Sequence, residues 1–358
     1  MIADIIRQRL EERESSLSHF AIRSRDTRGR RVVEEPLPLS TEFQRDLDSI
    51  LHTNAFRRLK HKTQVFIAPE GDHFVTRLTH TLEVAQIART ISRALNLNED
   101  LTEAIALGHD LGHTPFGHLG EEVLDILYPG GFRHNLQSLR VVDYLEGGGQ
   151  GLNLTKEVRQ GIVAHSKPRG SVLGGDGLNS LTLEAQVCRL ADAVAYINHD
   201  LADAFRAGVI TEDDLPKEAV TVLGSGHPQR INIMVSDIVE SSWPASGEVP
   251  IDEGSRPSIT MSAKIRRAVD ILRGFLFQRV YLPASQGEEG HIAREVISLL
   301  YHHYCRHPRD MTLTYVSGWE TTERSVVDHI AGMTDQYATR MAENIRPGIA
   351  KNLRFRLI

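Results

Sequence analysis

The sequence is poor in the features that mark secreted, disulfide-bonded and membrane-spanning proteins. Its 358 residues include only two cysteines, Cys188 and Cys305, which form no CxxC pair and give no disulfide framework. No apolar run approaches the roughly 18–20 residues that a transmembrane helix requires. Residues 1–14 are charged and lack the apolar core of a signal peptide. We therefore expect a cytoplasmic protein with buried thiols and no membrane segment.

An excess of positive charge is absent as well. The net charge is −6 at pH 7, so the molecule as a whole is not a basic nucleic-acid binder. Basic residues nevertheless gather in two short stretches, residues 23–31 and residues 57–62. We interpret the first stretch as a solvated loop or a subunit contact. The second stretch could clamp a polyanion.

Convincing β-alternation is missing, apart from short stretches at 63–67 and 313–316 that could form strands. Elsewhere, apolar residues recur every three or four positions, which predicts helices. These helices are expected at 1–17, 41–59, 76–95, 101–110, 119–127, 134–145, 155–165, 183–207, 231–241, 261–280, 291–304 and 321–344. The Gly-rich stretch 166–180 is expected to be a loop. We predict an all-α protein forming one continuous domain, with an N-terminal helix and arm (1–40), a core (41–210) and a C-terminal helical region packed on it (211–358).

Histidine is abundant, with 17 residues in the chain. Leu107–His118 holds three of them, and its His109-Asp110 pair ends an apolar helical pattern before glycines and a proline force a tight loop. His80 lies on the inward face of a predicted helix, either as a core histidine or as a ligand. Asp192 lies beside an apolar helix face, where an unpaired carboxylate would cost several kcal/mol. His80, His109, Asp110 and Asp192 form a mixed nitrogen and oxygen set that favours Mg, Mn, Fe or Ni.

The order of these four residues resembles the H…HD…D signature of HD-domain phosphohydrolases. The flanking sequence is more specific, and it resembles the deoxyguanosinetriphosphate triphosphohydrolase-like branch of that superfamily from about residue 21 to the last helices. The segments that carry the resemblance are Arg57–Val65, Thr76–Gln86, Gly108–His118 and Phe132–Ser138. The resemblance implies an HD-domain helical fold with additional C-terminal helices. It also implies a metal-dependent enzyme that hydrolyses deoxynucleoside triphosphates (dNTPs) to deoxynucleoside and tripolyphosphate.

The resemblance further implies roles for polar residues around the metal set. His113, His118 and His134 would contact the phosphates, with His113 or His118 acting as the general acid. Glu121 would orient one of these histidines, although it could equally be an ordinary charge in the first turn of a helix. The expected catalytic set is therefore His113, His118, Glu121 and His134.

The expected substrate contacts begin on the helix that carries Asp192. Tyr196 and Asp200 follow Asp192 at steps of four residues and therefore share its helix face. By resemblance, Tyr196 would pack under the deoxyribose, unless it is simply a core residue, and Asp200 would accept the 3′-hydroxyl. The remaining candidates are Gln64 for the sugar or base, Arg77 for the α-phosphate, and Arg58 and Lys62 as weaker phosphate contacts that could equally be subunit contacts.

The resemblance implies control of cytoplasmic dNTP pools by a homo-oligomer, expected to be a hexamer, with a nucleotide effector at subunit contacts. Another HD activity, such as a 5′-nucleotidase or a cyclic-nucleotide or alarmone hydrolase, would use the same four ligands. A different alternative is a nucleotide sensor or weak single-strand nucleic-acid-binding protein, for which the arginines of residues 23–31 are the only support. A panel of substrates separates the enzymatic alternatives, and salt-dependent strand binding identifies the last one.

Overall fold

The chain forms a helical assembly in a computed structural model that describes residues 2–67, 73–166, 180–252, 254–311 and 321–353. Over these residues no strand forms, and the only β-type pairing is an isolated bridge between Thr63 and Thr76. The all-α prediction is confirmed. The helices are α1 (Ile2–Arg13), α2 (Glu42–Leu51), α3 (Asn54–Arg58), α4 (Arg77–Ala94), α5 (Glu99–Gly108), α6 (His118–Leu127), α7 (His134–Arg140), α8 (Lys156–Ala164), α9 (Leu183–Arg206), α10 (Lys217–Leu223), α11 (His227–Ser241), α12 (Ala263–Leu276), α13 (Leu282–Gln286), α14 (Glu288–Arg306), α15 (Thr322–Ala331) and α16 (Asp335–Ile345).

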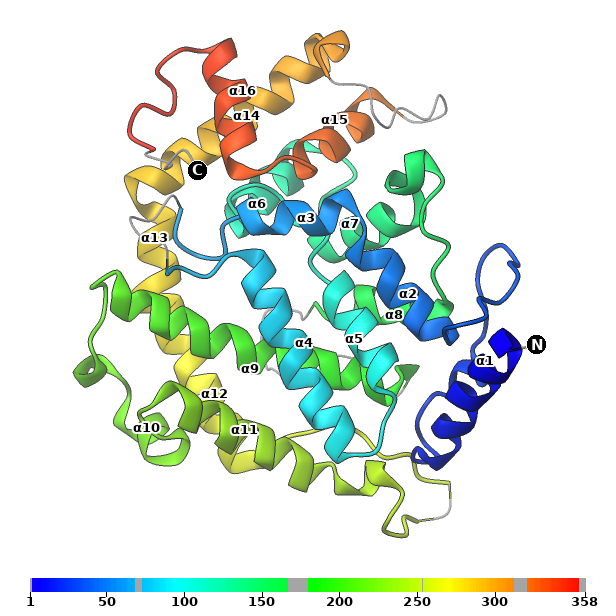
Figure 1. Cartoon of the computed structure of the whole chain (residues 1–358). Coiled ribbons are helices and arrows are strands. Elements are labelled where there is room, and N and C mark those ends of the chain that lie inside the picture. The colour runs from blue at the N-terminus through cyan, green and yellow to red at the C-terminus, as the bar shows by residue number, and fades with distance from the viewer. Residues whose placement is uncertain (1, 68–72, 167–179, 253, 312–320, 354–358) are drawn as a thin grey trace.

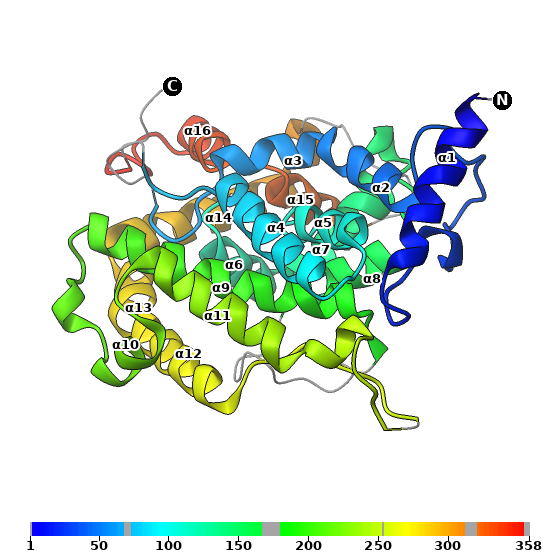
Figure 2. The same cartoon turned by 60° about the horizontal axis from the view of Figure 1, so that its bottom comes forward.

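Helices α4, α5 and α9 lie at the centre of the molecule, and α4 packs against both of the others. Figure 1 shows α14, α15 and α16 together on one side of this centre and α10, α11 and α12 on the other. The apolar side chains form two buried clusters. The larger one joins the central helices to α10–α12, and the second joins α6 to α14–α16. The turned view in Figure 2 shows α1 at the edge of the molecule, beside α2.

Local sequence explains where the main helices begin and end. Thr76 and Thr79 form a capping box at the start of α4, and Thr41 and Gln44 form one at the start of α2. Thr53 caps α3, so the single helix predicted at 41–59 is two helices. The helix predicted at 321–344 is also divided, into α15 and α16.

The short strand expected at 63–67 is wrong beyond the bridge at Thr63. The expected strand at 313–316 and nearly all of the expected loop at 166–180 lie outside the described residues. No helix among the described residues is long and apolar enough to cross a membrane.

The arginines of residues 23–31 fasten the N-terminal arm to the body of the protein. Arg30 forms ion pairs with Glu42 and Asp46, and its side chain is only 6% exposed. Arg28 pairs with Glu157 at 2.7 Å. The interpretation of this stretch as a solvated loop is therefore wrong for Arg30, whereas the side chain of Arg28 is 49% exposed. The subunit contact stays a prediction. The single-strand nucleic-acid alternative loses part of its support, because carboxylates of the same chain pair with both arginines.

Candidate functional site

The four predicted metal ligands come from three central helices and meet in the interior. His80 is on α4, His109 and Asp110 follow the end of α5, and Asp192 is on α9. Single ligand atoms of His80, His109 and Asp110 lie within 4.8 Å of one another. Asp192 Oδ1 lies 3.4 Å from His80 Nε2, and Asp110 Oδ1 lies 3.5 Å from His109 Nε2. Three of the expected ligands thus surround one point, and Asp192 lies beside His80.

The hydrogen bonds of the two imidazoles fit a bound cation. His109 Nδ1 lies 2.6 Å from the carbonyl oxygen of Ala106, so Nδ1 carries the proton and donates it. The lone pair of His109 Nε2 is then free, and this buried atom has no hydrogen-bond partner among the described residues. A buried nitrogen without a partner is costly, and a divalent ion would satisfy it. His80 likewise bonds through Nδ1, to His199 at 2.7 Å, and keeps Nε2 toward Asp192.

Arg77 joins the metal set to the loop that follows it. Its Nη1 donates to Asp110 Oδ2 at 2.6 Å, while Nε and Nη2 are buried and find no partner within the described part of the chain. A Cβ atom placed on Gly117 would lie 3.0 Å from Arg77 Nη2, so the guanidinium lies against this loop. Burial alone would raise the pKa of Asp110, but the charges of His109 and Arg77 outweigh it and hold that pKa well below its usual range. The unpaired nitrogens of Arg77 are suited to bind an anion.

The predicted catalytic residues form a second group beside the metal set. Single ligand atoms of His113, His118, Glu121 and His134 all lie within 4.8 Å of one another. The rings of His113 and His134 are stacked with centroids 4.4 Å apart. Glu121 accepts from His118 Nδ1 at 3.0 Å and from His134 Nδ1 at 2.9 Å.

Charge and exposure differ sharply within this group. Burial would raise the pKa of Glu121, but the hydrogen bonds from His118 and His134 hold it far below its usual range. Burial, reinforced by the charge of Arg77, lowers the pKa of His113 well below that of a free histidine. The side chain of His118 is 76% exposed. The same four residues could ligate an ion, but Glu121 already satisfies two of the imidazoles, so the group is better suited to contact phosphate.

His165, which the sequence reasoning missed, connects the two groups. Its Nε2 lies 3.0 Å from His134 Nε2, and its Nδ1 donates to the carbonyl oxygen of Ile162 at 2.6 Å. Its Nε2 must therefore accept a hydrogen bond from Nε2 of His134. Single ligand atoms of Asp110, His134 and His165 also fall within 4.8 Å of one another. The predicted catalytic histidines are thus immediately beside the metal set.

The predicted sugar-binding residues continue along α9. Asp200 is buried and accepts a hydrogen bond from the Tyr281 hydroxyl at 2.5 Å. Tyr196 is partly buried, and burial raises the pKa of its phenol. Gln64 lies in the segment before α4, and its buried Oε1 has no hydrogen-bond partner in the described structure. Asp192, Tyr196 and Asp200 therefore lie on one buried helix, as their spacing predicted.

Arg58 and Lys62 have different surroundings from those expected of phosphate contacts. Lys62 is 2% exposed, and its ammonium donates to the carbonyl oxygens of His113 and Ala331. Burial lowers the pKa of Lys62 to about 7. A buried ammonium that donates to two carbonyls supports the backbone at His113 from the side of α15. Lys62 is therefore not included among the proposed substrate contacts.

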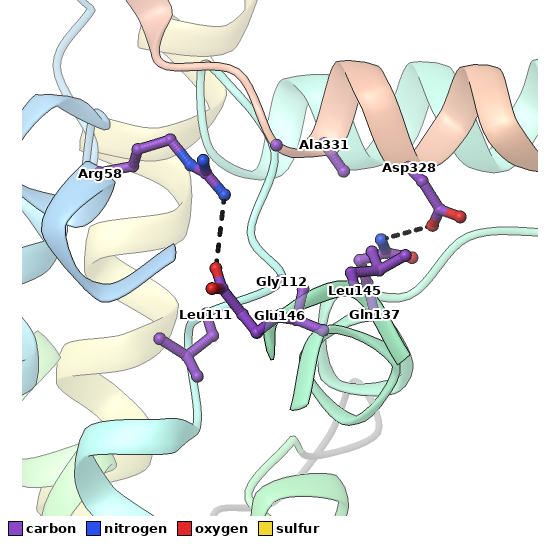
Figure 3. Close-up of a pocket in the computed structure, with 10 residues that line it drawn as sticks. Arg58, Leu111, Gly112, Gln137, Leu145, Glu146, Asp328 and Ala331 are labelled. Carbon is purple, nitrogen blue, oxygen red and sulfur yellow. Dashed lines mark hydrogen bonds and ion pairs between the residues drawn. The ribbon is translucent and has the colours of Figure 1, made fainter. Parts of the chain in front are cut away.

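Arg58 faces a small cavity behind residues 109–117, the loop that begins with the predicted ligands His109 and Asp110 and is called the metal-binding loop below. The cavity has a volume of about 30 Å³, enough for about one water molecule. Figure 3 shows Arg58 pointing toward Glu146 across this space, with 3.8 Å between Nη2 and Oε1. Leu111 and Gly112 line the same cavity. Arg58 is therefore close to the back of the loop and engaged by a carboxylate, which favours a supporting role.

The residues that sequence reasoning missed are His165, His199 and Tyr281. His199 offered a signal, because it follows Asp192 by seven residues and so falls on the same side of the helix. His165 ends its own helix as an isolated histidine, and Tyr281 follows α12 far along the chain. Neither of these two has a spacing that connects it with the metal ligands, so only the packing of the helices reveals them.

Comparisons with known proteins find two matching domain models and several similar chains. Residues 77–197 match the model of the HD domain, and residues 259–344 match that of the phosphohydrolase-associated domain. A deoxyguanosinetriphosphate triphosphohydrolase-like protein of Caldanaerobacter subterraneus subsp. tengcongensis is 51% identical over 93% of each chain. Proteins with the same description are 47% identical in Desulfatibacillum aliphaticivorans, over 95% of this chain and 97% of the relative, and 44% identical in Clostridium tetani, over 95% and 96%.

Proposed function

We propose that the chain hydrolyses dNTPs to deoxynucleoside and tripolyphosphate. The premise is that it belongs to the deoxyguanosinetriphosphate triphosphohydrolase-like family of HD-domain phosphohydrolases. The family resemblance expected from the sequence is confirmed. The choice of dNTPs as substrates, and of the bond that is cleaved, is our proposal.

The observation that carries the proposal is the position of Arg77. The buried guanidinium donates from one nitrogen to Asp110, and its other two nitrogens have no partner in the described structure. These two nitrogens could bind a second anion. That anion must lie beside the metal ligands, and an α-phosphate meets this requirement. Asp200 and Tyr196 lie further along α9, where a deoxyribose attached to that phosphate would extend. The spacing of the residues thus supports a nucleotide bound by both its phosphate and its sugar.

The metal site would hold a divalent ion through His80, His109, Asp110 and Asp192, and the ion would supply Lewis-acid polarisation of a phosphate oxygen. Arg77 would bind the α-phosphate and stabilise the negative charge that develops there. His113, stacked on His134, would line the phosphate site. Mg, Mn, Fe and Ni all suit these ligands.

In the proposed reaction, a water oxygen attacks the α-phosphorus and the bond from that phosphorus to the 5′-oxygen breaks. His118 would donate a proton to the 5′-oxygen. Glu121 fixes the ring of His118 through Nδ1, which leaves Nε2 to reach the leaving group. The hydroxyl of the water ends on phosphorus, and the proton that the water releases restores the proton of His118 through solvent. The products are therefore tripolyphosphate and a deoxynucleoside with a free 5′-hydroxyl.

The sugar contacts would provide selectivity. Tyr196 would pack under the deoxyribose and exclude a 2′-hydroxyl, and Asp200 would accept the 3′-hydroxyl. Gln64 would contact the sugar or base. A buried carboxylate that loses its hydroxyl partner is costly, so dideoxynucleotides should be poor substrates. A cytoplasmic homo-oligomer, expected to be a hexamer, with a nucleotide effector at subunit contacts completes the proposal.

The experiment is a substrate panel with product separation. The protein is incubated with each dNTP, singly and mixed, in the presence of Mg or Mn, and the products are separated by anion exchange. Tripolyphosphate and deoxynucleoside in equal amounts are expected. Pyrophosphate or single phosphates without tripolyphosphate would overturn the reaction. Hydrolysis of monophosphates alone would favour the 5′-nucleotidase alternative.

A further inference from the structure

His199 is a buried histidine to which the proposed reaction gives no role. It lies on α9 immediately before Asp200 and is 1% exposed. Its Nε2 is 2.7 Å from His80 Nδ1, on α4, and its Nδ1 is 2.9 Å from Asp200 Oδ1. Its ring lies nearly perpendicular to that of His80, at 80°. One imidazole thus connects a metal ligand with the carboxylate of the proposed sugar site.

The donors and acceptors in this chain follow from one requirement. His80 must keep the lone pair of Nε2 for a metal, because Nε2 is the nitrogen that lies 3.4 Å from Asp192. Its proton is then on Nδ1 and is donated to Nε2 of His199. A neutral imidazole that accepts at Nε2 carries its own proton at Nδ1. The nearest carboxylate oxygen to that nitrogen is Asp200 Oδ1 at 2.9 Å. The two atoms are too poorly aligned for a regular hydrogen bond among the described residues, so the link between His199 and Asp200 is a close polar contact.

Asp200 is held at its other oxygen as well. The hydroxyl of Tyr281 donates to Oδ2 at 2.5 Å, and Oδ1 is left to His199. A hydrogen bond therefore holds Oδ2, while Oδ1 has only its close contact with the imidazole of His199. Carboxylates that orient a ligating histidine usually contact it directly, whereas here a second histidine stands between them.

We propose that His199 is a positioning residue that couples Asp200 to the metal ligand His80. In this arrangement the carboxylate proposed to bind the sugar also influences the affinity for the metal, although it does not contact the metal. The link to sugar binding rests on the proposed function. The link to metal affinity does not, because it depends only on the three side chains. Linkage is reciprocal: if a ligand bound at Asp200 changes the affinity of the protein for the metal by some factor, the bound metal changes the affinity for that ligand by the same factor.

A double-mutant cycle on metal affinity tests the coupling. The metal-free protein is titrated with Co²⁺ against a competing chelator, and the absorption bands of the bound ion are recorded. His199→Leu and Asp200→Asn should each weaken Co²⁺ binding by about 10–100-fold, the usual effect of removing a residue that orients a ligand. The double variant should bind no more weakly than His199→Leu alone, because both changes break the same chain.

Two further variants separate positioning from simple packing. His199→Gln should bind Co²⁺ within a few-fold of the wild-type protein, since its amide can accept from His80 and donate toward Asp200. Asp203→Asn is the matched control. Asp203 is also a buried α9 carboxylate but accepts from the backbone of Val75 and from Arg206. It should leave Co²⁺ affinity unchanged.

The outcomes distinguish this inference from the proposed function, because no nucleotide is present in the titration. Wild-type Co²⁺ affinity in Asp200→Asn, or losses that simply add in the double variant, would overturn the coupling even if dNTPs are hydrolysed. Coupled losses in a protein that hydrolyses no dNTP would uphold it and remove only the function. Thermal unfolding of the metal-free variants shows whether each is folded. If His199→Leu is not, the comparison of His199→Gln with Asp200→Asn decides.

Discussion

At Gly112 the metal-binding loop lies directly against the backbone of α7, and replacing this glycine by alanine tests how tightly the site is packed. An added Cβ would lie 2.1 Å from the backbone nitrogen of Ser138 and 2.7 Å from the carbonyl oxygen of His134. Ordinary carbon contacts are about 3.5–4 Å, so the loop and α7 must separate by roughly 1 Å or more. Both atoms belong to the backbone, so no side-chain rotation can relieve the clash.

The Gly112→Ala variant should therefore lose both stability and activity. Overpacking of this kind costs about 1–3 kcal/mol in the free energy of unfolding. Gly112 follows Asp110 by two residues, and α7 carries His134. A shift of about 1 Å between them should reduce kcat/KM by roughly 100-fold.

Urea unfolding of the metal-free protein and steady-state kinetics with the best dNTP measure the two effects. Gly274→Ala is the matched control, because no described atom lies within 4 Å of an added Cβ there. Gly274 is inside α12, so alanine should raise stability by about 0.5–1 kcal/mol. If Gly112→Ala is as stable and active as Gly274→Ala, the close approach does not constrain the site.

Three other substitutions have definite expected outcomes. Arg77→Lys keeps the charge but loses the planar fork of donors, so kcat/KM should fall by about 10²-fold in steady-state assays; an unchanged value would remove Arg77 from the phosphate site. Lys62→Met removes the donor to two carbonyls and should cost about 1–3 kcal/mol in urea unfolding while KM stays unchanged; a raised KM would restore Lys62 as a substrate contact. Burial raises the pKa of Glu184 to about 7. Below about pH 4.5 the carboxyl is protonated in both the folded and the unfolded protein and burial carries no penalty for its charge, but as the pH rises through 7 the buried group ionises and the free energy of unfolding falls. Glu184→Gln keeps an acceptor for the backbone of Ile22 and Asn98, so it should be more stable than wild type at pH 8 by on the order of 1–3 kcal/mol and equal to it at pH 4; equal stability at both pH values would contradict this reasoning.

The metal site could be predicted from sequence because its signals are local. His109 and Asp110 end a helix at a glycine-bent loop, and Asp192 recurs with Tyr196 and Asp200 at helical spacing on one face. Each signal depends on residues within a few turns of one another, where periodicity determines which side chains share a face. Periodicity gives only the face of each helix, whereas the resemblance to HD-domain phosphohydrolases joined residues of three helices into one expected set.

The supporting residues could not be predicted, because long-range packing alone brings them to the site. Tyr281 contacts Asp200 across 81 positions of the chain. Lys62 looked like a phosphate contact because it lies in a basic stretch, but Ala331, 269 positions away, accepts its proton. A basic residue near a site has the same sequence signature whether its ammonium faces solvent, substrate or a buried carbonyl.

The C-terminal helices hold the metal-binding loop from behind, although their sequence alone gave no indication of chemistry. Asp335, at the start of α16, accepts from the backbone nitrogens of Thr63 and Phe116 at 2.8 and 3.0 Å. It thereby ties the segment before α4 to the loop that carries the proposed catalytic histidines His113 and His118. Asp328, on α15, accepts from Gln137 on α7 at 2.8 Å. These buried bonds tie α7 to α15 and the loop after α5 to α16, so we expect the phosphohydrolase-associated region to help fix the positions of His113 and His134.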